Sequence, residues 1–289
     1  MDYSRLIQYL SEGIGTAIFV IILNLVALHA REKDTKKAKV AVGFGYGAGL
    51  AIAILTLSAI SGQTNGPAFF NPAYTLGLAV SKLFPWQQSY EFIIAQVIGA
   101  IVGQLIVVAL GYTAYREIDD STKLLSTFVV INDLDDRTYA QRGAAWVNGA
   151  LTEFIGSFIF FFGLTAFNYT GIGGGTISYM TSQLQQSAEQ SGGAYSAAQL
   201  NLLSRMYVFG VQAVDALAIG LFAGILVATL NVSLNPARDL GPRFVHAIIP
   251  SSILGDAKDD SRWWYAWVPI ILPIVAAIAA VALFKIIYQ

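Results

Sequence analysis

The chain has 289 residues, of which 55% are hydrophobic and 12% are charged, and its net charge is −1. Soluble domains carry about 25% charged residues, so this composition excludes a disordered chain, a coiled coil and an ordinary cytosolic enzyme. The chain has no cysteine and only two histidines, which excludes disulfides, thiolate chemistry and Cys- or His-rich metal sites. The charge balance gives no reason to expect nucleic acid as a partner, and we expect no cofactor.

Six apolar stretches are long enough to cross a bilayer, whose hydrocarbon core takes about 20 helical residues. They are residues 6–30, 40–60, 92–115, 144–169, 206–230 and 263–284, and none contains more than one acidic residue. The last stretch opens with several aromatic residues, which is typical of the membrane interface: Trp263, Trp264, Tyr265 and Trp267. The sequence therefore predicts an all-α membrane protein, with residues 1–289 forming a single transmembrane domain.

Two shorter stretches, residues 61–85 and 231–250, are too apolar for exposed loops and too short to cross the membrane twice. Irregular backbone at membrane depth is tolerated only where it is buried in protein or lines a wet cavity. We therefore interpret both stretches as re-entrant half-helices.

The chain contains an internal repeat, residues 1–115 and 144–289, joined by a linker at 116–143. Glu12-Gly13-Ile14-Gly15 resembles Glu153-Phe154-Ile155-Gly156, and Asn71-Pro72-Ala73 pairs with Asn235-Pro236-Ala237. Each half contains three spans and one re-entrant piece. An odd number of spans forces the halves into opposite orientations, so we expect the half-helices to enter from opposite faces and meet near the midplane.

The paired Asn-Pro-Ala motifs predict a site at this meeting point. Asparagine is a good N-cap and proline is favoured in the first helical turn, so each motif begins a short helix. A helix N-terminus carries roughly half a positive charge and unpaired N–H groups. Two such ends facing each other, with the amides of Asn71 and Asn235, suit water and hydroxyl oxygens and repel cations, including hydronium.

Three charged side chains lie at membrane depth near these motifs. Glu12 and Glu153 could relay protons, but we favour a structural role in which each accepts N–H groups from the chain entering its own half-helix. Arg238 follows the second motif and keeps its charge. At a pore wall it would donate to solute hydroxyls and repel cations; a simple salt bridge with a neighbour such as Asp239 is the alternative.

These residues resemble the major intrinsic proteins, the aquaporin and aquaglyceroporin family, over nearly the whole chain. The likeness includes Ala95-Gln96, Gly99-Ala100 and Gly103 in the third span. The residues around Arg238, where Asp239 follows directly, are similar to the glycerol-conducting branch. The resemblance implies an aquaporin-like fold of six helices plus two half-helices, Asp239 as structural support, and one pore per subunit of a homotetramer. It also implies a cell-membrane location with both termini in the cytoplasm.

The resemblance further implies a selectivity filter of four residues. Three of them are Tyr46, Val232 and Arg238, and the fourth is Ala223 or Val227 on the fifth span. We prefer Ala223, which lies twelve residues before Asn235 when no gap is allowed. Small apolar side chains beside an aromatic ring would leave a wide, partly apolar constriction, suited to the carbon edge of glycerol.

The chain departs from the family in its connections. Residues 63–70 lengthen the approach to the first motif, and residues 171–205 form a long connection that we interpret as a passive, partly helical surface segment. With cytoplasmic termini, the basic residues of the 31–39 and 116–142 connections lie outside the cell, against the positive-inside rule.

We interpret the chain as a passive channel for water and small uncharged solutes such as glycerol that excludes protons and ions. The alternative is a secondary transporter, which also uses inverted repeats and broken helices. That function needs a coupling-ion site, and only Glu12, Glu153 and Asp215 could supply carboxylates to it. No nucleophile–base spacing indicates an enzyme.

Overall fold

The computed structural model describes residues 3–30, 35–61, 68–132, 138–169, 182–183, 185–190 and 196–288. Within these ranges the regular secondary structure is helical, which confirms the predicted all-α class. The helices are α1 (Tyr3–Ala30), α2 (Thr35–Ser61), α3 (Pro72–Val80), α4 (Trp86–Leu110), α5 (Tyr112–Arg116), α6 (Ser121–Ser126), α7 (Tyr139–Tyr169), α9 (Ala197–Leu230), α10 (Pro236–Ile248), α11 (Ser251–Leu254) and α12 (Trp267–Tyr288).

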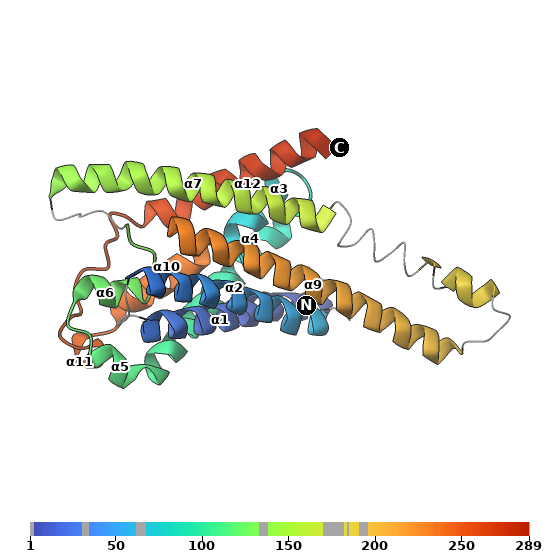
Figure 1. Cartoon of the computed structure of the whole chain (residues 1–289), viewed down its shortest axis with the longest axis horizontal. Coiled ribbons are helices and arrows are strands. Elements are labelled where there is room, and N and C mark those ends of the chain that lie inside the picture. Colours follow the sequence, from blue (N-terminus) through green and yellow to red (C-terminus); the bar gives the residue numbers. More distant parts are fainter. Residues whose placement is uncertain are drawn as a thin grey trace.

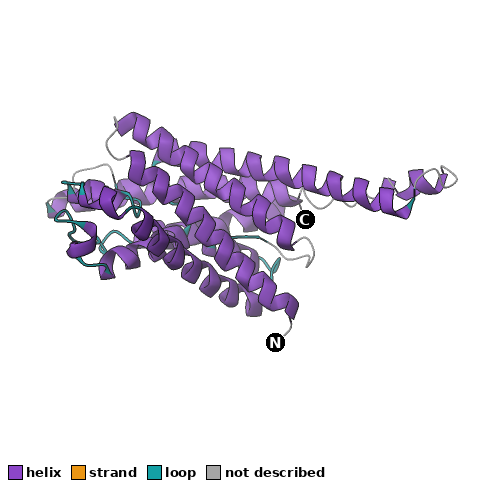
Figure 2. Ribbon diagram, turned by 90° about the horizontal axis from the view of Figure 1, so that it is seen from below, coloured by secondary structure: helices purple, strands orange, loops and turns teal. Residues whose placement is uncertain are grey.

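Six helices in the described part of the chain are long and apolar enough to cross a membrane: α1, α2, α4, α7, α9 and α12. They form one bundle that runs along the long axis of the molecule (Figures 1 and 2). Each overlaps one of the six apolar stretches of the sequence, so the predicted number of spans is confirmed. The helices α3 and α10, of nine and thirteen residues, are too short to cross a bilayer.

The predicted boundaries of the fifth and third spans are wrong. The fifth span begins at Ala197 instead of residue 206, because Ser196 and Gln199 form a reciprocal capping box that starts the helix early. Its 34 residues make a helix about 51 Å long, and its first turns project beyond the bundle (Figure 1). The third span occupies Trp86–Leu110 instead of 92–115, because its polar first turns are already helical and Gly111 caps its end.

Small residues let neighbouring spans approach closely. A Cβ atom on Gly99 of α4 would collide with the carbonyl oxygen of Gly13 on α1, and one on Gly103 would lie 2.7 Å from that of Ala17. In the other pair of helices, a Cβ atom on Gly47 of α2 would collide with the carbonyl oxygen of Gly220 on α9. Backbone-to-backbone packing of this kind holds membrane helices together where the hydrophobic effect between them is weak.

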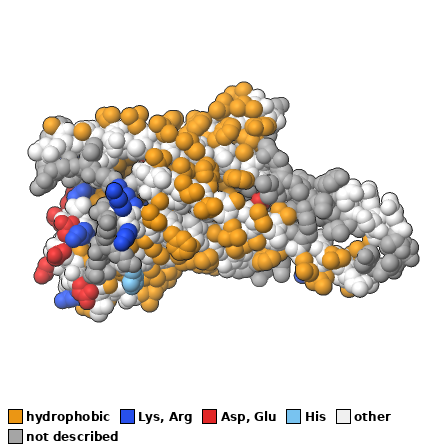
Figure 3. Space-filling view, in the orientation of Figure 1, with side chains coloured by type: hydrophobic (Ala, Val, Ile, Leu, Met, Phe, Trp, Pro, Cys, Tyr) orange, Lys and Arg blue, Asp and Glu red, His pale blue; other side chains and the backbone are white. Residues whose placement is uncertain are grey.

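The outer surface of the bundle is apolar. Large side chains repeat every four residues along α4 and remain exposed, as expected for contact with lipid or another apolar partner: Trp86, Tyr90, Ile94, Ile98 and Val102. On the face drawn in Figure 3, apolar side chains form a broad band across the bundle, and charged side chains gather at the end of the molecule that carries α5, α6 and α11. The two chain termini lie on the opposite side (Figure 1).

Candidate functional site: the junction of two half-helices

Each Asn-Pro-Ala motif begins a half-helix in the same way. Asn71 and Asn235 are N-caps with nearly identical backbone angles, φ −150° and ψ 110° against φ −148° and ψ 111°. The Oδ1 atom of each accepts the backbone N–H two residues on, from Ala73 and Ala237, at 3.0 Å in both cases. Because the capping oxygen is turned towards its own helix, the amide nitrogen of each side chain points away from it.

Those amide nitrogens tie the two motifs to each other. Nδ2 of Asn71 donates to the carbonyl oxygen of Leu234 at 2.9 Å, and Nδ2 of Asn235 donates to that of Phe70 at 2.7 Å. The side-chain amide of each asparagine therefore donates a hydrogen bond to the backbone carbonyl of the residue just before the other asparagine. The N-termini of α3 and α10 face each other inside the bundle, all four residues being buried.

The residue before each asparagine has a left-handed backbone, which turns the incoming chain into the helix. Phe70 has φ 51° and Leu234 has φ 59°, a region that bulky side chains rarely adopt. Such a conformation persists only where surrounding contacts hold it. At both positions a buried glutamate supplies those contacts.

Glu12 and Glu153 accept hydrogen bonds from the two incoming segments. The Glu12 carboxylate accepts the N–H groups of Phe69 at 2.6 Å and Phe70 at 2.8 Å. The Glu153 carboxylate accepts those of Ser233 and Leu234, both at 2.8 Å. Each glutamate thus pairs two backbone donors that would otherwise be buried without partners.

Each of these glutamates braces the segment that enters a half-helix, but the two braces differ in their third partner, which was not predicted from the sequence. Nε2 of Gln96 on α4 donates to Glu12 at 2.7 Å and to the Thr75 hydroxyl of α3 at 3.1 Å. At Glu153 the third donor is the Ser157 hydroxyl, one turn along the same helix, at a longer 3.3 Å. The brace on the first half-helix is therefore connected to more of the bundle than the brace on the second.

The second half-helix also carries a buried ion pair. Asp239 accepts from Nε of Arg243 at 2.7 Å, and neither side chain is exposed. Asp239 also accepts the N–H of Val130 at 3.2 Å, and Arg243 donates to the Ser261 carbonyl at 2.7 Å. Asp239 therefore pairs with Arg243 and not with Arg238, because residues four apart on a helix face each other and adjacent residues do not.

Arg238 is buried, with 2% of its surface exposed, and its Nε and Nη1 atoms have no hydrogen-bond partner in the described part of the chain. The guanidinium lies within electrostatic range of Asp239, Tyr46 and Glu153. The Tyr46 hydroxyl donates to the carbonyl oxygen of Ser233 at 3.0 Å, beside Val232. The structure therefore brings three of the four predicted filter residues to the segment that leads into α10.

The fourth filter position remains a choice between two residues on one buried face of α9. Ala223 is fully buried and Val227 is 4% exposed. The backbone of Gly47 packs on α9 at residues 220–224. This register puts the neighbouring Tyr46 at the height of Ala223, and Val227 one turn away.

The lengthened approach to the first motif brings aromatic residues beside it. Of residues 63–70, positions 63–67 lie outside the described residues. Phe69 contacts Tyr74 edge-on at 5.5 Å and Phe84 at 5.0 Å, measured between ring centroids. The Phe70 ring fills the space beside Gly15 of α1. The segment that enters α3 is therefore surrounded by aromatic rings.

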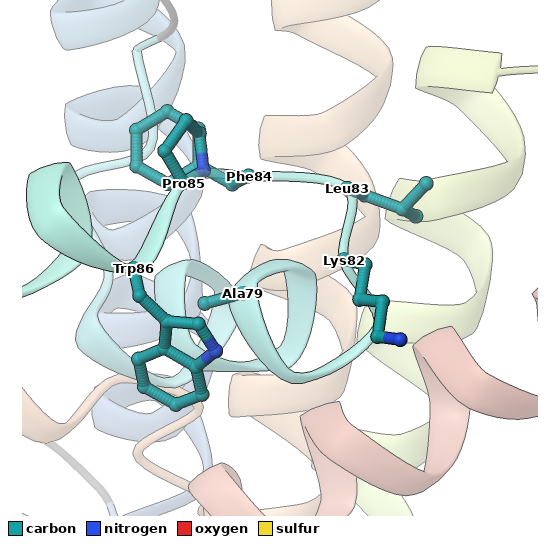
Figure 4. A pocket seen from close by; sticks show the side chains of 6 residues that line it. All are labelled: Ala79, Lys82, Leu83, Phe84, Pro85 and Trp86. Atoms are coloured by element: carbon teal, nitrogen blue, oxygen red, sulfur yellow. The ribbon is translucent and has the colours of Figure 1, made fainter.

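A separate cavity of about 430 Å³ opens at the turn between α3 and α4 (Figure 4). It is lined by Ala79, Lys82, Leu83, Phe84, Pro85 and Trp86. These residues lie at and just after the C-terminal end of α3, the end away from Asn71, so this cavity is not part of the junction. Among the described residues no group of three or more His, Asp or Glu side chains could hold a metal ion.

Comparisons with known proteins agree with this architecture. The family model described as "Major intrinsic protein" matches residues 2–202 and 204–284. The chain is 39% identical to the "Glycerol facilitator-aquaporin gla" of Lactococcus lactis subsp. cremoris over 298 residues, covering 100% of both chains. It is 30% identical to the "Glycerol uptake facilitator protein-like 5" of Lactiplantibacillus plantarum, covering 97% of this chain and 96% of the other.

A solved structure shares the fold. The aquaglyceroporin of Plasmodium falciparum superposes with a TM-score of 0.61 over 98% of this chain and 97% of that chain, at 18% sequence identity. The end-to-end half-helices, the six spans and the family match over nearly the full length agree. The chain belongs to the major intrinsic protein family and has its aquaporin-like fold.

Proposed function

We propose that the chain is a passive membrane channel for glycerol, water and similarly small uncharged solutes, and that it excludes protons and other ions. The observation that carries this proposal is the junction at which Asn71 and Asn235 hold two helix N-termini face to face. The family is one of channels, so the function is transport and not catalysis. The relatives named as glycerol facilitators support glycerol as a solute.

The electrostatics of the junction favour neutral oxygen-bearing molecules. Each Nδ2 group has two N–H bonds, of which one reaches the opposite loop and the other can donate to a passing oxygen. The two N-termini together place positive potential at the same point. A hydroxyl or water oxygen is stabilised there, whereas a cation that has shed its water is repelled.

Arg238 and Tyr46 supply the second part of the path. The Nε and Nη1 donors of Arg238 are buried without partners among the described residues, which is costly unless a solute supplies the acceptor. The Tyr46 ring offers an apolar surface nearby. A polyol can therefore turn its hydroxyls towards Arg238 and its carbon edge towards Tyr46, with Val232 and Ala223 leaving space.

The secondary-transporter alternative is less well supported. A coupling-ion site needs a carboxylate whose oxygens can bind the ion. Of the three candidate carboxylates, those of Glu12 and Glu153 are already engaged by backbone donors at the two half-helices. A cation at either position would have to displace the contacts that hold Phe70 or Leu234 in place. Asp215 on α9 is the remaining candidate, because its Oδ1 atom has no hydrogen-bond partner among the described residues.

Stopped-flow light scattering on proteoliposomes separates the two functions. A channel gives fast shrinkage under sucrose and fast re-swelling under glycerol, at rates independent of proton or sodium gradients. Accumulation of glycerol driven by an ion gradient would reject the channel. Ala223→Phe and Val227→Phe then locate the filter in the same assay: the variant at the true filter position blocks glycerol, and we expect this of Ala223→Phe.

We also propose a cell-membrane location with both termini in the cytoplasm, although charged residues collect at the other end. The absence of native cysteine makes this directly testable. Ser126→Cys on α6 and Ser196→Cys before α9 both lie at exposed positions, at opposite ends of the bundle. A membrane-impermeant maleimide should label the first in intact cells and the second only after permeabilisation; the reverse pattern would overturn the orientation.

We further propose that the channel is a homotetramer in which each subunit has its own pore. The apolar outer faces of the spans leave large surfaces for contact between copies and with lipid. Mass measurement in lipid nanodiscs tests this directly: a mass of four chains is expected, and a stable single chain that conducts glycerol would contradict it.

A further inference from the structure

The Tyr74 side chain crosses from the first half-helix to the other repeat. Its ring stacks on Phe161 of α7 with the centroids 5.9 Å apart and an interplanar angle of 6°. Its hydroxyl accepts a hydrogen bond from Nδ2 of Asn168 on α7 at 3.2 Å. Because α3 itself packs mainly on α12 and α4, these side chains bridge the space between α3 and α7.

The position of Tyr74 on α3 explains why it reaches into that space. The next residue, Thr75, bonds Gln96 of α4. Successive helical residues are about 100° apart, so Tyr74 turns away from α4. Tyr74 also lies three residues after Asn71 and thus shares its side of the helix, the side that faces the other repeat.

Phe161 lies on the inward face of α7. Glu153, Ser157 and Phe161 are four residues apart in turn and are all buried, so they form one stripe. Glu153 holds the loop at the junction, and Phe161 lies two turns further along, about 12 Å. The stacked rings therefore lie beyond the junction, towards the end of α7 at Tyr169.

Phe69 packs against Tyr74 as well. Its ring meets Tyr74 edge-on at 5.5 Å and comes from the segment that enters α3. Tyr74 is 3% exposed and Phe161 is fully buried. The Tyr74 ring thus contacts a ring from α7 and a ring from the entering loop, on the side of the junction that leads away from Asn71 and Asn235.

We propose that Tyr74, Phe161 and Phe69 form a second constriction of the pore, and that it limits the size of the polyol that passes. The proposal rests on the channel function proposed above. The aromatic faces match the carbon edge of a polyol, and the Tyr74 hydroxyl and Asn168 amide give one polar edge. A linear three-carbon polyol has a carbon edge on one side, hydroxyls on the other and a small cross-section. A longer polyol requires the Tyr74 and Phe161 rings to move further apart.

The test is the ratio of erythritol to glycerol permeability, measured by stopped flow in proteoliposomes. Tyr74→Ala removes the ring that bridges α3 and α7, and Phe161→Leu removes the other half of the stack. For Tyr74→Ala we expect the ratio to rise about tenfold, which corresponds to a barrier lowered by about 1.4 kcal/mol. Tyr90→Ala makes the same substitution at a site on α4 that is 54% exposed, and should leave the ratio unchanged.

The outcomes separate this inference from the channel function. Wild-type protein that conducts glycerol, with an unchanged ratio in Tyr74→Ala and Phe161→Leu, overturns the constriction and leaves the channel standing. Wild-type glycerol permeability equal to that of empty liposomes overturns the channel function itself. If Tyr74→Ala is not monodisperse in detergent, Phe161→Leu decides the question, because it preserves most of the buried volume.

Discussion

The two glutamate braces should contribute unequally to stability, and this difference can be calculated from their contacts. Glu12→Ala leaves the N–H groups of Phe69 and Phe70, and one N–H of Gln96, without an acceptor. A buried donor that loses its partner costs about 1–3 kcal/mol. With some relaxation of the loop, the three donors together predict a loss of about 3–6 kcal/mol.

Glu153→Ala should cost less. It strands only two backbone donors, those of Ser233 and Leu234, while the Ser157 hydroxyl can rotate to another acceptor. Two unpaired donors predict about 2–4 kcal/mol. Thermal unfolding in detergent, followed by fluorescence-detected size exclusion, should therefore place Glu12→Ala below Glu153→Ala and both below wild type.

The control is Glu189→Gln, because Glu189 is exposed and lies far along the chain from both half-helices. It should unfold at the wild-type temperature. If Glu12→Ala and Glu153→Ala do the same, the bracing role is refuted. Normal stability combined with a loss of pH-gradient-dependent transport would instead support the proton-relay alternative.

Three other substitutions test the filter, the ion pair and the helix packing. Tyr46→Ala should raise permeability to polyols longer than glycerol in the stopped-flow assay, and unchanged selectivity would remove Tyr46 from the filter. Asp239→Asn should lower the unfolding temperature, since breaking a buried pair with Arg243 costs about 3–5 kcal/mol; wild-type stability would show that the pair is dispensable. Gly99→Ala should destabilise the bundle by about 1–3 kcal/mol or more through overpacking, whereas Gly210→Ala on α9, with open space around it, should be neutral or slightly stabilising.

Much of the fold follows from local signals in the sequence. In lipid, the backbone N–H and C=O groups of about twenty consecutive apolar residues find hydrogen-bond partners within a helix, so the number of spans could be predicted. The start of each half-helix could be predicted as well, because Asn71-Pro72 and Asn235-Pro236 encode the cap and first turn. Helix ends beyond the membrane were harder, since residues 197–205 mix polar and apolar side chains and no change in apolarity marks the start of the helix after Ser196.

The candidate site was harder to predict wherever it depends on contacts between distant segments. The stacking of Tyr74 on Phe161 could not be predicted from any local sequence pattern, because it depends on how α3 packs relative to α7. The Asp239–Arg243 pair did have a local signature, because residues four apart on a helix face each other, whereas the adjacent residues Arg238 and Asp239 do not. The choice between Ala223 and Val227 depends on the register of α9 against α2, which no local pattern specifies.

The central claim is that two facing helix N-termini pass neutral oxygen-bearing solutes and exclude protons. The most direct measurement follows glycerol re-swelling and internal pH together, in proteoliposomes that carry a pH-sensitive dye and a potassium diffusion potential. The account predicts glycerol permeability well above that of empty liposomes, with proton flux equal to theirs. Proton flux that rises with protein content, or glycerol permeability no greater than in empty liposomes, would contradict it.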